Sequence, residues 1–165
     1  MAKEKLSAAS YVTRGYGQVE FNHISGQKTG RMYAQLPLAG DKLENGQFAK
    51  YDYENNEVNF DGKGEWFLHY SEVKLYEARE TEEDFVVLKD GPCPRLYGTL
   101  VGDIYTTNMV NGTTETLTAG KILTVNKNGI LEINAAPEAD EMQWQIAKAY
   151  TMPDGTPGVK LVRIN

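Results

Sequence analysis

The sequence predicts an all-β protein. Two observations support this: short segments in which apolar and polar residues alternate, and turn-forming residues between those segments. Alternation with a period of two is typical of a strand that is buried on one face. It occurs in segments 19–24, 47–53, 57–60, 72–76, 121–125, 130–133 and 159–164. Short strands at such spacing predict antiparallel β-barrel or sandwich modules.

Asn and Gly residues mark the turns between these segments. Asn55-Asn56 separates 47–53 from 57–60, and Asn128-Gly129 separates 121–125 from 130–133. These residue types tolerate the positive φ angles that tight hairpins need. We therefore predict that each of these two pairs of segments forms a β-hairpin.

The two halves of the chain resemble each other. Leu43–Phe48 (LENGQF) is similar to Leu117–Ile122 (LTAGKI), with leucine, glycine and the next apolar residue in the same places. Farther on, Trp66 in EWFL occupies the place of Trp144 in QWQI. The matches favour two related copies of one β-module, and chance similarity between strand–turn–strand segments is the alternative.

The first 35 residues differ from the rest, because they are rich in glycine and poor in bulky apolar residues. Such a segment buries little surface by itself and is expected to become ordered against a neighbour. Pro92 and Pro94 mark a stiff junction, since proline fixes φ and has no backbone N–H to donate. The predicted division is an extended N-terminal arm at 1–35, a first β-module at 36–90, a Pro-rich junction at 91–95 and a second β-module at 96–165.

Composition excludes several functions. The chain has 165 residues, a net charge of −6, one cysteine and two histidines. One cysteine excludes a disulfide framework and an all-cysteine metal site. An acidic chain lacks the basic surface that binds nucleic-acid phosphates. No secretory signal or membrane-length apolar run is visible, so we expect no membrane association. From the charge and the low cysteine and histidine counts we also expect no nucleic-acid partner and no cofactor or metal.

Candidate reactive residues are few. Cys93 lies between two prolines, which favours a structural role over a nucleophilic one. The acidic run 77–84 lacks the alternating ligands and the glycine of a calcium loop, and a solvated loop is the favoured interpretation. A weak hydrolase that uses Glu80, Glu82 and Glu83 is the enzymatic alternative. We expect no catalytic residues and no enzymatic activity.

Ten tyrosines and two tryptophans are spread along the chain. Tyrosine buries apolar area and still forms hydrogen bonds, so it is common in cores and at protein interfaces. This interpretation is favoured over a sugar-binding surface. In the alternative, a glycan-binding β-sandwich, Trp66 and Trp144 line the site.

The phrases LENGQF at Leu43–Phe48, LTAGKI at Leu117–Ile122 and YTMPDG at Tyr150–Gly155 resemble those of virion structural proteins of tailed bacteriophages. The likeness is greatest to capsid decoration (auxiliary head) proteins. The resemblance implies a protein without catalysis that is made in the host cytoplasm and binds the outer surface of the virion capsid. It also implies that the protein stabilises the shell, with the major capsid protein as partner and self-association, favouring a trimer.

The same resemblance implies that the arm lies across capsid subunits. Its candidate contact residues are Val19, Phe21, Ile24 and Tyr33. Another virion part, such as a tail-tube or head-fibre protein, remains a further alternative.

Overall fold

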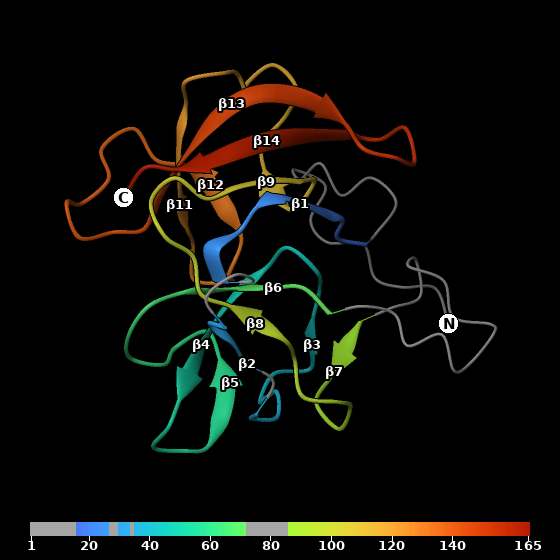
Figure 1. The fold of residues 1–165 in the computed structure, drawn as a ribbon, viewed down its shortest axis with the longest axis vertical. Helices are drawn as coiled ribbons and strands as arrows, with labels where there is room; N and C mark the ends of the chain where they lie inside the picture. Colours follow the sequence, from blue (N-terminus) through green and yellow to red (C-terminus); the bar gives the residue numbers. More distant parts are fainter. Residues whose placement is uncertain (1–15, 27–29, 34, 72–85) are drawn as a thin grey trace.

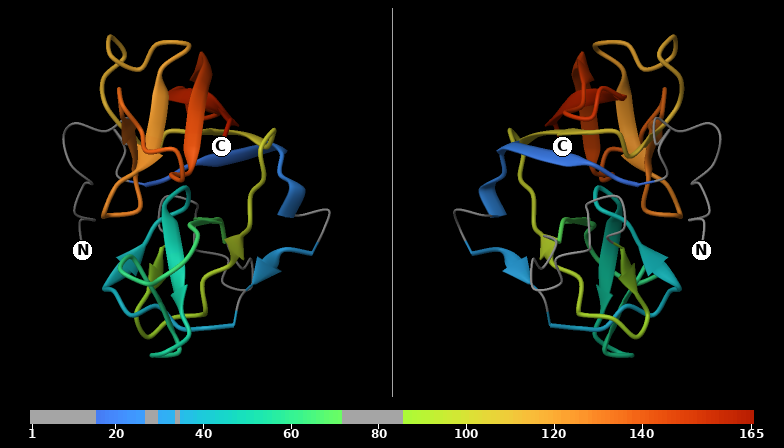
Figure 2. Two further views of the ribbon diagram at one scale, coloured as in Figure 1. Left: turned by 90° about the vertical axis from the view of Figure 1, so that its left-hand side faces the viewer. Right: turned by 90° about the vertical axis from the view of Figure 1, so that its right-hand side faces the viewer.

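The structure, a computed structural model, describes residues 16–26, 30–33, 35–71 and 86–165. Within these residues fourteen strands form three sheets, and the predicted all-β class is confirmed (Figure 1). The seven-stranded sheet occupies the upper half of Figure 1, and the two smaller sheets lie below it. Figure 2 shows the same two halves from the sides.

The largest sheet contains the C-terminal half of the chain and one N-terminal strand. In spatial order its strands are β1 (Val19–His23), β9 (Ile104–Thr107), β14 (Pro157–Arg163), β13 (Gln143–Thr151), β11 (Ile122–Val125), β12 (Leu131–Ile133) and β10 (Val110–Asn111). Neighbouring strands are antiparallel except β10 and β12, which are parallel.

The second sheet belongs to the N-terminal half. Its strands in spatial order are β2 (Met32–Tyr33), β8 (Leu96–Tyr97), β6 (Phe67–His69), β4 (Phe48–Asp52) and β5 (Glu57–Asn59). All of these neighbours are antiparallel, and Leu38 adds a parallel bridge to Val58 of β5. A third sheet pairs β3 (Lys42–Leu43) with β7 (Val87–Leu88).

The two halves have the same strand order. In the C-terminal half, β9 to β14 are numbered one to six along the chain. In the N-terminal half, the same numbers go to β2, the Leu38 bridge, β4, β5, β6 and β8. Both arrangements then read 2-4-3-5-6-1, and the parallel pair joins positions two and four in each. β1 is an addition to the C-terminal half, and the β3–β7 pair is an addition to the N-terminal half.

The two similar sequence phrases form the same turn. Gly46 has φ 89° and Gly120 has φ 85°, a left-handed region that favours glycine. The Gly46 amide donates to the carbonyl of His69 and the Gly120 amide donates to that of Ile146, both at 2.8 Å. Each turn therefore leads into the third strand of its half (β4 or β11) next to the fifth strand (β6 or β13).

The matched registers also place core residues at equivalent positions. Ala49 lies opposite Phe67 in one half, as Leu123 lies opposite Trp144 in the other. Each half packs its matched residues into its own hydrophobic cluster. The matched pairs are Leu38 with Val110, Leu43 with Leu117, Ala49 with Leu123, Tyr51 with Val125, Val58 with Leu131, Phe67 with Trp144, and Leu96 with Leu161.

A shared core joins the halves. Phe48, Leu68 and Tyr97 point away from the N-terminal cluster and belong to the same buried cluster as Tyr105 and Trp144. The outer face of the five-stranded sheet therefore packs against the inner face of the seven-stranded sheet, as in a sandwich.

The placement of two short strands differs from the predicted division. β8, assigned to the second module, lies beside β6 in the five-stranded sheet, and β2, assigned to the arm, lies beside β8. The predicted strand at 72–76 and the acidic run 77–84 lie outside the described residues.

Candidate functional site

The N-terminal strand lies inside the sheet system of this chain. β1 pairs along β9, and Val19 and Phe21 are half-buried against the shared core. The Phe21 ring contacts the rings of Tyr70 and Tyr97, each with centroids 4.9 Å apart. Sequence reasoning left these side chains to be covered by a partner, and in the structure the chain covers them itself.

Ile24 follows β1 and is 1% exposed, so it also contributes to the shared core. Tyr33, the fourth predicted contact residue, lies in β2, where its backbone pairs with Leu96. Residues 1–15 lie outside the described residues, and their contact with a capsid stays a prediction.

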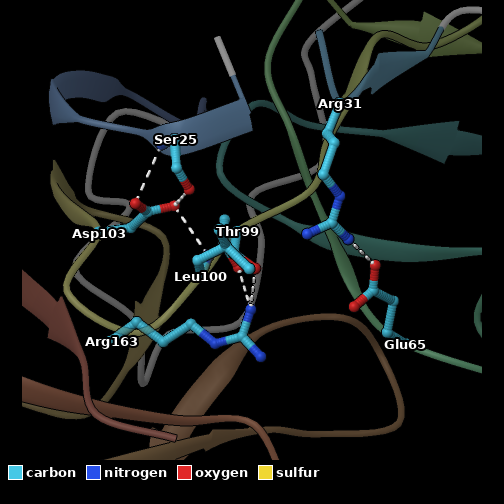
Figure 3. Close-up of polar contacts among 7 residues, drawn as sticks. All are labelled: Ser25, Arg31, Glu65, Thr99, Leu100, Asp103 and Arg163. Atoms are coloured by element: carbon cyan, nitrogen blue, oxygen red, sulfur yellow. Dashed lines mark hydrogen bonds and ion pairs between the residues drawn. The ribbon is translucent and has the colours of Figure 1, made fainter. Parts of the chain in front are cut away.

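A buried carboxylate fixes the chain where it leaves β1. Asp103 is 1% exposed, and its carboxylate accepts hydrogen bonds from the Ser25 amide at 3.0 Å, the Ser25 hydroxyl at 2.7 Å and the Leu100 amide at 2.9 Å (Figure 3). Three donors satisfy a charge that would otherwise be costly to bury. This cluster ties the N-terminal segment to the connection between the two halves.

Two arginines lie in the same region of the structure, each with its own polar partner (Figure 3). The Arg163 guanidinium donates to the carbonyl and, at 2.7 Å, to the hydroxyl of Thr99. Burial lowers the pKa of Arg163, although nearby Glu65 and Asp103 favour its charged form. Arg31 forms an ion pair with Glu65. The residues of this network come from distant parts of the chain, so no local motif indicated it.

A hollow of about 250 Å³ adjoins the network. Glu65 and Trp66 of the N-terminal half and Arg163 of the C-terminal half line it. The remaining lining residues are Gly64, Thr124, Val125, Asp140, Glu141 and Met142. Carboxylates, a guanidinium and an indole can together bind a polar, hydroxyl-rich molecule. Lys50 Nζ lies 4.5 Å from the centre of the Trp66 ring, so a cation already covers one face of that ring.

Trp144 is not part of this hollow. Its side chain is fully buried between Phe48 and Tyr105, and its indole N–H has no hydrogen-bond partner among the described residues. The prediction that both tryptophans line one glycan site is therefore wrong. The registers explain why: Phe67 matches Trp144, so Trp66 matches Gln143, on the other face of its strand.

The remaining reactive side chains have structural surroundings. His69 is fully buried, and its Nδ1 lies 2.8 Å from the Glu44 carbonyl. Desolvation lowers its pKa to about 4, so the ring is neutral near pH 7. Cys93 is a free, half-buried thiol. Among the described residues no three His, Cys, Asp or Glu side chains are placed to hold a metal ion.

In the described ranges no helix has both the length and the apolar character needed to cross a membrane. Comparison of the whole chain with protein-family models, with curated proteins and with solved structures gave no match. The function must therefore be argued from the residues themselves.

Proposed function

We propose that this protein is a non-enzymatic virion structural protein that binds the outer surface of a phage capsid and stabilises the shell. The resemblance of its sequence to capsid decoration proteins supports this function. The described part of the chain agrees with a structural role, because its buried polar side chains hold strands and turns in place. Asp103 and His69 are examples.

The position of the N-terminal strand is the observation that carries the proposal. β1 is the last strand of the seven-stranded sheet, and no other strand of the described residues lies beyond it. A sheet edge of this kind can accept an additional strand from another protein. Residues 1–15 directly precede β1, so an arm that binds a capsid would begin at this edge.

The first test concerns the genes that surround the one encoding this chain. A major capsid protein gene is expected among them, and its absence would argue against the proposal. Capsids assembled from that protein should then bind the purified chain saturably in a sedimentation assay. Capsids carrying the chain should also resist heating better than bare capsids. If the assembled capsids do not bind the purified chain, the proposed function is wrong.

A deletion of residues 1–15 tests the arm separately. The control carries the same fifteen residues in scrambled order, so that length and charge are kept. Both variants are expected to fold and to lose capsid binding. Unchanged affinity of the deletion variant would refute the arm while leaving the decoration role intact. Light scattering of the purified chain tests the proposed trimer.

Glycan binding at the Trp66 hollow is the second candidate, favoured by the indole and carboxylates that line it. Trp66→Ala should abolish any binding detected on a glycan array. Lys127→Ala, in an exposed turn of the other half, is the control and should bind like the unmodified chain. An array without hits for the unmodified chain would exclude this function.

A further inference from the structure

A second hollow lies at the tip of the β4–β5 hairpin. Its volume is about 240 Å³. The hairpin forms one wall and the loop that follows β5 forms the other. The lining residues are Tyr51, Asp52, Tyr53, Glu54, Asp61, Gly62 and Lys63.

Tyr53 dominates this surface. Its side chain is 71% exposed, the highest value among the exposed large apolar residues of the described ranges. Its ring stacks on that of Tyr51, with centroids 5.6 Å apart and an angle of 20° between the planes. The stack holds Tyr53 in one orientation, so little conformational entropy is lost when a partner covers it.

The other half of the chain shows that the hairpin itself does not require this tyrosine. Asp52 caps its turn by accepting from the amides of Glu54 and Asn55. Asn126, the equivalent residue at the end of β11, caps its own turn by accepting from the amides of Asn128 and Ile130. The next residue is Tyr53 in one hairpin and Lys127 in the other. The loop of the second hairpin is one residue shorter, and it carries a lysine at the position of Tyr53, so a capped hairpin at this place does not need a tyrosine.

The hollow is negatively charged. Three carboxylates, from Asp52, Glu54 and Asp61, line it together with one cation, Lys63. The pKa of Asp52 is lowered, mainly by the hydrogen bond from the Asn55 side-chain amide and then by the one from the Asn55 backbone amide. Asp52 therefore stays ionised near neutral pH. The Lys63 ammonium lies 3.1 Å from Glu54 Oε1, and both side chains are largely exposed. Asp61 is exposed at the rim.

We propose that this hollow, the Tyr53 pocket, is a docking site for an arginine or lysine side chain of a partner protein. The cation would lie against the exposed tyrosine ring and between Asp61 and Glu54, which suits its charge and its apolar stem. Charge complementarity of this kind provides specificity and fast association. The inference does not depend on the capsid role, since it concerns only the chemistry of the side chain that is bound.

A tetra-arginine peptide titrated into the isotopically labelled full-length chain tests the pocket by NMR. Saturable shifts confined to residues 51–63 are expected, and a tetra-glutamate peptide should cause none. Absence of saturable shifts, or shifts spread over the whole surface, would overturn the proposal.

Four variants make the test specific. Tyr53→Ala should weaken binding of the peptide about tenfold, as expected for an aromatic hot spot. Lys127→Ala, at the equivalent place in the other hairpin, should leave the affinity unchanged. Asp61→Asn and Asp41→Asn each remove one exposed carboxylate, and only Asp61→Asn should weaken binding. Equal effects of the two aspartate variants would mean that the peptide responds to net charge alone, and the proposal would fail.

Discussion

Acidification should destabilise this protein through His69. The ring is fully buried, and its Nδ1–H donates to the Glu44 carbonyl while its Nε2 lies 2.9 Å from the Ser71 hydroxyl. Ser71 Oγ in turn accepts from the Arg95 amide at 3.1 Å. This network connects the Gly46 turn, β6 and the start of β8, and it requires the neutral ring.

The sign and size of the effect follow from the lowered pKa. Burial lowers the pKa of His69 from 6.5 to about 4, so the unfolded chain binds the proton more tightly than the folded one. Stability is therefore greatest above the unfolded value and falls as the pH drops from 6.5 towards 4. With about 1.4 kcal/mol per pKa unit, the full effect is about 3 kcal/mol. About 2 kcal/mol of this is lost between about pH 7 and pH 5.

Urea denaturation followed by tryptophan fluorescence at several pH values measures this loss. His69→Asn is the matched variant, because an amide nitrogen can still donate to the Glu44 carbonyl but does not titrate. The variant should be less stable at pH 7 and should depend on pH less steeply than the unmodified chain. If both proteins lose stability in parallel over this range, His69 does not cause the dependence and the reasoning is refuted.

Four further substitutions test the packing and the buried carboxylate. Phe48→Ala removes a ring from the core that the halves share and should cost about 3–5 kcal/mol of unfolding free energy in urea; a cost near zero would contradict the shared core. Gly129→Ala should cost about 3 kcal/mol or more, because its φ is +72° and a Cβ would lie 2.0 Å from the Phe48 carbonyl oxygen. Gly120→Ala, with φ +85° and open space around the new methyl, should cost only about 1–2 kcal/mol. Equal melting points for the Gly129→Ala and Gly120→Ala variants would refute this difference. Asp103→Asn should lower stability by about 2 kcal/mol, because three donors converge on the carboxylate, and calorimetry checks it.

The sequence predicted the elements that depend on local signals. The segments that form β4, β5, β11 and β12 alternate clearly, and each hairpin turn contains residues suited to its backbone. Asn56 has φ 55° and Gly129 has φ 72°, as such turns require. Neither prediction needed information from elsewhere in the chain.

Other elements depend on distant partners and gave no local signal. β9 places Thr107 in the interior, where its hydroxyl donates to the Gln18 carbonyl at 2.7 Å. The adjacent Asn108 side chain accepts from the Gln18 amide, also at 2.7 Å. A polar residue at a buried position hides the alternation, and its partner is 89 residues away. The network at Asp103 escaped prediction for the same reason.

The two tryptophans show a different limitation. Aligning Trp66 with Trp144 matched residue types, whereas the strand registers match Trp66 with Gln143. A shift of one residue moves a side chain to the opposite face of a sheet. The true correspondence of the halves could be established only from the pairing of their strands.

The place of β1 has a consequence for how the chain folds during its synthesis. Its partner β9 lies far along the chain, since Asn22 accepts a hydrogen bond from Thr106, 84 residues later. While a ribosome makes the intervening segment, Val19 and Phe21 have no strand to pair with. Closing so long a loop is slow, because its entropic cost precedes the gain from pairing. The nascent N-terminal segment therefore stays open to chaperones or to another copy until the second half emerges.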